Sequence, residues 1–252
     1  MSNIIIKTNK LCKSFSSGGN QQHVLKNLDL EIAEGDFTVI MGASGSGKST
    51  LLYALSGMDT PSLGDVEYDN QNIAGLSQDE LAIFRRKNCG FIFQQINLMD
   101  YMTVMDNILA GGLLLTKDRK AVAARAGKLL EQVGIAGKIW SKFPSQISGG
   151  EAQRVGIVRA LINSPRTVFA DEPTGALNHA SSIQVLDILT DVNEQGQSIV
   201  MVTHDKNSAV RGNRIIYLRD GIICGECQLG RFEKDRPERT EKLNTFLKEM
   251  GW

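Results

Sequence analysis

The chain has 252 residues, of which 42% are hydrophobic and 22% are charged, the proportions of an ordinary globular protein. This length suits one large α/β domain, or one such domain with a smaller lobe. Its 28 basic and 28 acidic side chains give a formal net charge of zero, which argues against a general attraction to nucleic acid or anionic lipid. Any bound anion must therefore be held by local geometry.

The amino-terminal region is not expected to direct the chain into a membrane. Residues 4–7 are strand-like and carry neither a basic segment nor a small-residue cleavage site, so no signal peptide is predicted. The apolar stretch 108–115 is too short to span a bilayer and contains Gly111 and Gly112. We expect a protein on the cytoplasmic side whose membrane role comes through a partner.

The first third of the chain is expected to consist mainly of strands. Apolar runs and alternating polarity predict strands over residues 4–7, 28–32, 37–41 and 64–73. The third run is apolar throughout, as is typical of a buried strand, and the fourth turns at Asp69-Asn70. A helix is predicted over residues 48–56, followed by Gly57.

The rest of the chain divides into a helical middle and an alternating carboxyl-terminal part. Residues 77–161 are mostly helical by periodicity, with a capping box at Ser77 and Glu80 and a second helix over 121–133. Strands and helices then alternate, which predicts a parallel sheet with crossover helices. The predicted segments are strands over 167–170, 198–203 and 214–218 and a helix over 180–194. The helical middle is therefore expected to be an inserted lobe.

A phosphate-binding loop is predicted at residues 42–49, Gly-Ala-Ser-Gly-Ser-Gly-Lys-Ser, which match GxxxxGK followed by Ser or Thr. Its glycines allow several N–H groups to point into one concavity at a helix N-terminus. Lys48 is expected to contact the β- and γ-phosphates, and Ser49 to bind Mg²⁺. A chance glycine-rich turn is disfavoured by the flanking strand and helix. The expected nucleotide-binding residues are Gly42, Ser44, Gly45, Gly47, Lys48, Ser49 and Thr50.

A second part of the nucleotide site is predicted at Asp171 and Glu172, which end the apolar run 168–170. Asp171 is expected to hold Mg²⁺, directly or through water, and Glu172 to act as the general base toward the attacking water. The alternative is a solvated strand end, but the turn at residues 173–175 favours two fixed acids. The two parts together predict ATP hydrolysis.

Residues 147–151, Ile-Ser-Gly-Gly-Glu, resemble the signature sequence of the ABC ATPase family and precede the acid pair, as in that family. Residues 11–225 are similar to the family's motif order. The resemblance implies an α/β fold, a P-loop NTPase with a mainly parallel sheet, an antiparallel N-terminal β subdomain and an inserted helical lobe at about residues 95–162. It places one ATPase domain at residues 1–225 and a C-terminal extension at 226–252.

The signature is expected to be a second anion-binding helix start, formed by Ser148, Gly149 and Gly150. The resemblance implies that the signature of one copy closes over the γ-phosphate held by the P-loop of another. This arrangement is a head-to-tail homodimer with two ATP molecules between its chains. One chain alone should bind ATP but hydrolyse it poorly.

The resemblance also assigns three side chains outside these motifs. Gln94 corresponds to the glutamine that senses Mg²⁺ and water and links the lobes, and His204 to the histidine that contacts the γ-phosphate and steadies Glu172. Phe15 corresponds to the aromatic residue that stacks on adenine. Two departures are present: the usual LSGGQ is ISGGE, and Asn178 replaces an interface carboxylate, which alters charge but keeps an acceptor.

The segment 98–108 directly follows the glutamine and contains Met99, Met102 and Met105 at every third residue. This stripe is either part of the lobe's own core or an adaptable groove that receives a membrane permease.

Residues 84–87 and 171–178 resemble the MacB-like branch of the ABC ATPase family. The branch implies a bacterial protein at the cytoplasmic face of the plasma membrane with a permease of MacB/FtsX-like type.

Two other classes of function compete with that of a transporter subunit. A soluble ABC ATPase acting on nucleic acid usually has two cassettes or a long coiled coil, and the neutral charge also disfavours it, so no nucleic-acid partner is expected. A non-transporting ATPase that regulates or transmits force to a permease-like partner stays open as the alternative. Within transport, export of or resistance to antimicrobial peptides is the suggested role.

The carboxyl-terminal part carries two further features. Leu243, Phe246, Leu247 and Met250 are spaced as one face of a short helix, which is expected to pack on the domain or a partner rather than on a membrane. The four cysteines suit a reducing compartment. Cys224 and Cys227 form a CxxC without a second ligand pair, so a packing role is favoured over a redox or metal site, and on a strand they would point to opposite faces.

Overall fold

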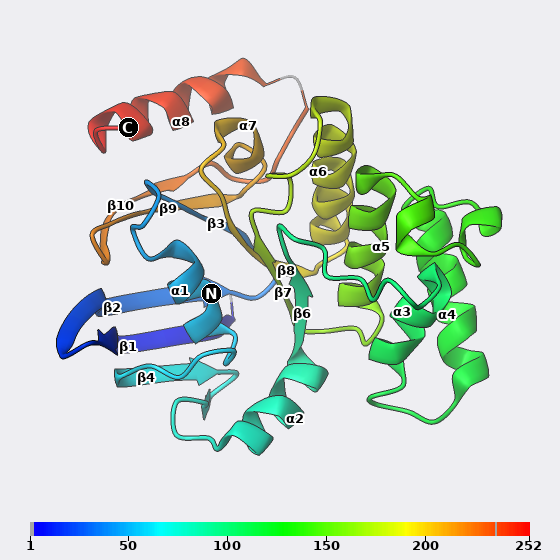
Figure 1. Ribbon diagram of the computed structural model, residues 1–252. Helices are drawn as coiled ribbons and strands as arrows, with labels where there is room; N and C mark the ends of the chain where they lie inside the picture. Colours follow the sequence, from blue (N-terminus) through cyan, green and yellow to red (C-terminus); the bar gives the residue numbers. More distant parts are fainter. Residues whose placement is uncertain (1–2, 235) are drawn as a thin grey trace.

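The computed structural model describes residues 3–234 and 236–252, and its main sheet has six strands in the order β10-β9-β3-β8-β7-β6 (Figure 1). Adjacent strands from β9 to β6 are parallel, and only β10 runs antiparallel to its neighbour β9. The mainly parallel sheet is therefore confirmed. Its strands are β3 (Phe37–Met41), β6 (Cys89–Ile92), β7 (Thr167–Asp171), β8 (Ser198–Val202), β9 (Arg214–Arg219) and β10 (Ile222–Gln228).

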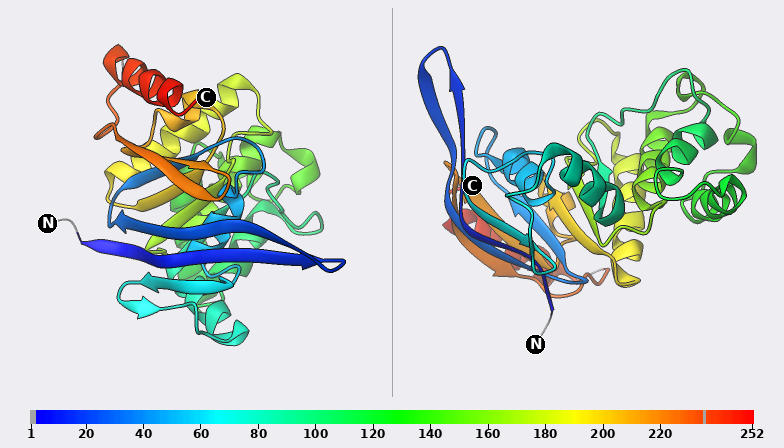
Figure 2. Two further views of the ribbon diagram at one scale, coloured as in Figure 1. Left: turned by 90° about the vertical axis from the view of Figure 1, so that its left-hand side faces the viewer. Right: turned by 90° about the horizontal axis from the view of Figure 1, so that it is seen from below.

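A second, four-stranded sheet has the order β2-β1-β4-β5 and is antiparallel, as expected for the N-terminal β subdomain. Its strands are β1 (Ile4–Ser17), β2 (Asn20–Ala33), β4 (Leu63–Tyr68) and β5 (Gln71–Asn72). The β1–β2 hairpin is longer than the predicted strands 4–7 and 28–32, and it extends beyond the body of the molecule (Figure 2). Residues 20–23 of β2 are exposed, so no apolar pattern marks the outer part of the hairpin.

The helices of the middle form a lobe with its own core, on the right of Figure 1. That core contains Val104, Ile108, Leu130 and Val158. The capping box at Ser77 is confirmed at the start of α2. The α-helices of the described residues are α1 (Lys48–Leu55), α2 (Gln78–Asn88), α3 (Val104–Gly112), α4 (Arg119–Gln132), α5 (Gly149–Leu161), α6 (His179–Glu194), α7 (Lys206–Ala209) and α8 (Pro237–Glu249).

One strand of the main sheet was missed within the middle region. Residues 89–92, which we expected to be part of a mostly helical stretch, form β6 and pair with β7. The strand packs closely against α5, since a Cβ built on Gly90 would lie 2.4 Å from the carbonyl oxygen of Ala160. Four residues are too few to show a strand periodicity between two helices.

The main sheet is covered on both faces. Leu51, Leu52 and Leu55 of α1 fill the space between the two sheets, while α5, α6 and α8 cover the opposite face. The packing of α8 onto the domain is confirmed, because Leu243 and Leu247 are buried against that face.

The boundary that we expect between the ATPase domain and the C-terminal extension, at residues 225 and 226, lies within β10. Among the described residues, no helix combines the length and apolar character that crossing a bilayer needs.

The two cysteines of the CxxC lie on one face of the sheet, so the expectation of opposite faces is wrong. Cys227 is buried in the core beneath α8, and Cys224 is half-buried against the same core. A register shift between Ile223 and Gly225 adds a residue to β10 and reverses the alternation of side chains. Both thiols are free.

Candidate functional site

Three chain segments that carry the predicted chemistry meet at one edge of the main sheet. β3 leads into the glycine loop, β7 ends at Asp171 and β8 leads to His204. The strands are adjacent and parallel in the order β3-β8-β7, so their carboxyl ends lie together. This edge is where α/β proteins bind ligands.

The glycine loop is held in a conformation that other residues would not adopt. Gly47 has a φ of 100°, and a Cβ built on Gly42 would lie 2.1 Å from the carbonyl oxygen of Leu218. Lys48 is buried, and its ammonium group donates to the carbonyl oxygens of Gly42 and Ala43, both at 2.9 Å. Burial lowers the pKa of Lys48, while the carboxylates of Glu172 and Asp171 act in the opposite direction.

The loop leads directly into the N-terminus of α1, with Lys48 as the first residue of the helix. Ser44 and Gly45 are exposed on the loop, and Thr50 is half-buried in the first helical turn. The unpaired N–H groups and the dipole of a helix start favour an anion at this point. The residues therefore fit a bound polyphosphate.

The Asp171 carboxylate accepts hydrogen bonds from two hydroxyl groups of α1. The Ser49 hydroxyl donates to Oδ1 at 2.9 Å, and the Tyr53 hydroxyl donates to Oδ2 at 2.8 Å. A serine hydroxyl and a carboxylate are hard oxygen donors of the kind that Mg²⁺ prefers, so this pair fits the cation. Tyr53 was missed by the sequence analysis, although its place four residues after Ser49 puts both on one helix face.

Glu172 lies beside the histidine predicted to act with it. Its Oε1 is 2.8 Å from Nδ1 of His204, and its Oε2 accepts the hydroxyl of Thr203 at 3.3 Å. The Glu172 side chain is 14% exposed and that of His204 is 64% exposed. Glu172 has a φ of 47°, a strained conformation that is concentrated at functional sites. Thr203 is a further partner that the sequence analysis did not identify.

Gln94 lies against the turn that follows the two acids. The Gln94 amide nitrogen is 3.0 Å from a Cβ built on Gly175, and the side chain is exposed. Gln94 follows β6, the neighbour of β7, which explains how it reaches this turn.

Asn178, which follows the same turn, accepts a hydrogen bond from the N–H of Ser181 and caps α6. Asparagine caps a helix as well as aspartate does, so the replacement preserves the fold there.

The signature residues lie at the start of α5, which Figure 1 shows on the other side of the sheet from α1. Ser148 caps the helix and is exposed with Gly149, whereas Gly150 is buried: a Cβ there would lie 2.5 Å from Oγ of Ser181. The N–H and the hydroxyl of Ser148 both donate to the Glu151 carboxylate at 2.8 Å. These bonds lower the pKa of Glu151.

Phe15 projects from the β1–β2 hairpin and is 46% exposed. The Lys13 ammonium group lies 5.0 Å from the centre of the Phe15 ring. That ammonium group is itself fixed, because it pairs with Asp59 at 2.6 Å and donates to the carbonyl oxygen of Thr60 at 2.8 Å. The structure thus places an exposed aromatic ring on the hairpin, with a cation held close to it.

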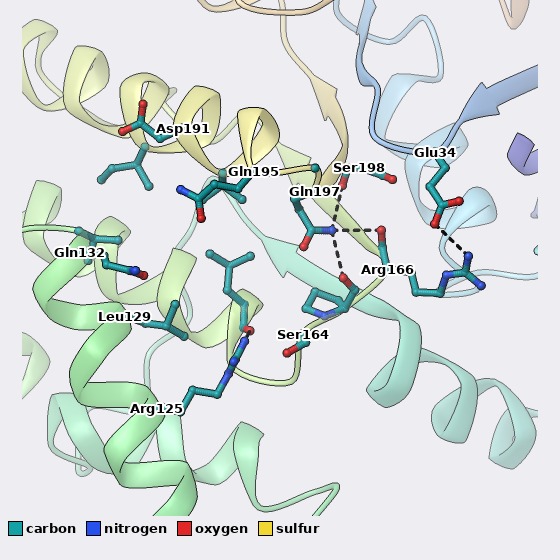
Figure 3. Close-up of a pocket in the computed structure, with 16 residues that line it drawn as sticks. Glu34, Arg125, Leu129, Gln132, Ser164, Arg166, Asp191, Gln195, Gln197 and Ser198 are labelled. Atoms are coloured by element: carbon teal, nitrogen blue, oxygen red, sulfur yellow. Dashed lines mark hydrogen bonds and ion pairs between the residues drawn. The ribbon is translucent and has the colours of Figure 1, made fainter. Parts of the chain in front are cut away.

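A cavity of about 540 Å³ lies between α4 and α6, at the amino ends of β7 and β8 (Figure 3). Two of its polar side chains are engaged by the backbone: Gln197 donates to the carbonyl oxygens of Pro165 and Arg166, and Arg125 donates to that of Ile162. None of the predicted catalytic residues lines it. The candidate site is therefore the opposite edge of the sheet.

Comparisons with known proteins agree with this geometry. The family model described as ABC transporter matches residues 25–175. The chain is 44% identical over 222 residues to the macrolide export ATP-binding/permease protein MacB of Neisseria meningitidis, covering 88% of this chain but 34% of that protein. It is also 44% identical over 219 residues to an uncharacterized ABC transporter ATP-binding protein of Methanocaldococcus jannaschii, covering 87% of this chain and 97% of that one.

Solved structures give the same result. The dimeric post-hydrolysis state of the ATP-binding cassette MJ0796, bound to ADP and Pi, is similar with a TM-score of 0.82 and 37% identity, covering 90% of this chain and 100% of that one. A second dimeric structure of that cassette has the same TM-score and 39% identity. The chain spans about a third of the MacB relatives it matches.

Proposed function

The chain belongs to the ABC transporter family and is an ATP-hydrolysing, ATP-binding protein of it; from this premise we propose that two copies clamp two ATP molecules and drive a separate membrane permease. The observation that carries the proposal is the convergence of Lys48, Ser49, Asp171, Glu172 and His204 at the carboxyl ends of three adjacent strands.

Within one copy, Lys48 and the N–H groups of the loop and α1 bind the β- and γ-phosphates. Ser49 and Asp171 hold Mg²⁺, which when bound withdraws charge from the phosphates and so eases cleavage. Glu172 orients the attacking water and takes its proton at a carboxylate oxygen. His204, at 2.8 Å from Glu172, keeps that carboxylate in place, and Gln94 lies against the turn that follows Glu172.

The second copy is proposed to complete the site with Ser148 and the N–H groups of Gly149 and Gly150. Ser148 and Gly149 are exposed at the start of α5, on the other side of the sheet from α1, which favours a role toward another chain rather than toward their own P-loop. The dimeric state of the similar cassette structures supports this arrangement. Phe15 is proposed to stack on the adenine ring from the hairpin.

A groove of about 460 Å³, lined in part by β6 and Phe93, is the proposed docking site for the permease. Apolar side chains from both lobes, including Met58, Phe93 and Leu114, line it together with Arg85 and Arg159. The groove favours a short helix with apolar and acidic side chains. Met99, Met102 and Met105 do not line this groove: Met105 packs against the core of the lobe, whereas Met99 is 44% exposed.

We further propose a permease of MacB/FtsX-like type and a location on the cytoplasmic face of a bacterial plasma membrane. The similarity to MacB, whose name joins ATP-binding and permease parts, supports this assignment. Export of or resistance to antimicrobial peptides is the substrate class that we put forward. Identifying the membrane protein that co-purifies with the chain, and measuring peptide-stimulated ATP hydrolysis of that complex, tests the assignment.

The nucleotide site is tested with Lys48→Ala. Removing the ammonium group should weaken ATP binding by about 10-fold or more, since a hydrogen bond to a charged group contributes about 1.5–3 kcal/mol. Binding of a fluorescent ATP analogue to the purified chain is the measurement. An unchanged dissociation constant would show that residues 42–49 do not bind the phosphates.

A further inference from the structure

Tyr53 connects the phosphate-binding helix to the carboxylate at the end of β7, and no motif of the chain accounts for it. It lies on α1 one turn after Ser49, and its hydroxyl donates to Oδ2 of Asp171 at 2.8 Å. Residues four apart on a helix share one face, so both hydroxyl groups point toward the same strand end. Tyr53 therefore contacts the proposed metal site without being a ligand of it.

The two hydroxyl groups fix the Asp171 carboxylate from both sides. Ser49 occupies Oδ1 at 2.9 Å, and Tyr53 occupies Oδ2. A carboxylate with one partner can rotate about its last side-chain torsion, whose energy wells are broad. With a partner on each oxygen, both ends of the group are held by one rigid helix.

We propose that Tyr53 is a positioning residue for the magnesium site, holding Asp171 in the orientation in which it also binds Ser49. The inference rests on the proposed function, because it takes Ser49 and Asp171 as the donors for Mg²⁺. Partners that orient a metal ligand set its affinity for the metal, and losing one typically weakens metal binding by about 10- to 100-fold. Nucleotide contacts of Lys48 do not involve Tyr53 and should persist.

Tyr53→Phe is the test variant, because it removes only the hydroxyl group. The chain offers a matched control at the other end of β7: the Tyr68 hydroxyl donates to Oγ1 of Thr167 at 2.7 Å. Tyr68→Phe thus removes a tyrosine hydroxyl from the same strand, far along it from Asp171. Circular dichroism verifies that both variants are folded.

The measurement is the affinity of Mn²⁺, a spectroscopic substitute for Mg²⁺, for the complex of the chain with ADP. Free Mn²⁺ is followed by electron paramagnetic resonance with the chain in excess of ADP. Tyr53→Phe should raise the Mn²⁺ dissociation constant by about 10-fold, and Tyr68→Phe should change it by less than about twofold. In EDTA, the ADP affinity of both variants should equal that of the unmodified chain.

The possible results separate the role of Tyr53 from the existence of the magnesium site. Mn²⁺ binding by Tyr53→Phe that is as tight as in the unmodified chain, or tighter, would overturn the positioning role. An equal loss in Tyr68→Phe would also overturn it, because the effect would then reflect the strand as a whole. If the unmodified chain itself binds ADP without any enhancement of Mn²⁺ binding, the proposed magnesium site fails, and this result is separate from the inference on Tyr53.

Discussion

Replacing Glu172 by glutamine separates nucleotide binding from hydrolysis at the proposed site. The change removes the proton acceptor but keeps the size of the side chain and its ability to bond with Thr203 and His204. General base catalysis contributes about 10²- to 10⁴-fold to a rate. At about 1.36 kcal/mol for each tenfold, the variant should raise the barrier by about 3–5 kcal/mol.

Folding should be almost unaffected by the same change. The Glu172 side chain is 14% exposed and retains its two partners, and glutamine tolerates the φ of 47° as well as glutamate does. A stability change below about 1 kcal/mol corresponds to a Tm shift of at most about 4 °C in a chain of this size. Loss of hydrolysis therefore cannot arise from unfolding.

The assay is phosphate release from ATP, measured beside the affinity for a fluorescent ATP analogue. Glu131→Gln is the control, because it makes the same chemical change on the exposed surface of α4. We expect Glu172→Gln to lose at least about 100-fold in rate with unchanged affinity, and Glu131→Gln to keep both. Turnover by Glu172→Gln at the rate of the unmodified chain would remove Glu172 from the role of base.

Three further changes test separate parts of the structure. Arg239→Met should destabilise the fold by about 3 kcal/mol and lower the Tm by about 6–12 °C. The reason is that the buried guanidinium group of Arg239 donates hydrogen bonds to the carbonyl oxygens of five residues. A Tm within about 2 °C of that of the unmodified chain would contradict this. Ser77→Ala should cost about 1 kcal/mol in urea unfolding through loss of the α2 cap, and an unchanged midpoint would show that the cap is dispensable. Phe15→Ala should weaken ATP binding by about 2- to 10-fold by titration, whereas equal affinity would exclude adenine stacking.

The parallel sheet and the helical lobe were predictable because strand-like apolar runs alternate with helical segments along the chain. The strand before Gly42 is apolar throughout and leads into a recognisable phosphate loop and helix, and the confirmed capping box marks the start of α2. The outer part of the β1–β2 hairpin was not predictable, because it is exposed and lacks apolar alternation. The face of the sheet on which Cys224 lies depends on a bulge in β10, which a sequence pattern does not reveal.

The site was predictable as far as motifs describe it. Lys48, Asp171 and His204 belong to segments whose spacing and position at strand ends indicate a shared edge of the sheet. Tyr53 and Thr203 were missed, since their role depends on which hydroxyl reaches a carboxylate after folding. The spacing of Tyr53 from Ser49 was the one signal available.

The measurement that tests the central claim most directly is the mass of Glu172→Gln by light scattering during size-exclusion chromatography. A single chain has a mass of 27.6 kDa. If ATP is clamped between the P-loop of one copy and Ser148 of the other, the variant should elute at twice that mass with Mg²⁺ and ATP, and as a single chain with ADP. Adding Ser148→Arg should abolish the dimer. Saturation with ATP and Mg²⁺ at the mass of one chain would contradict the shared site.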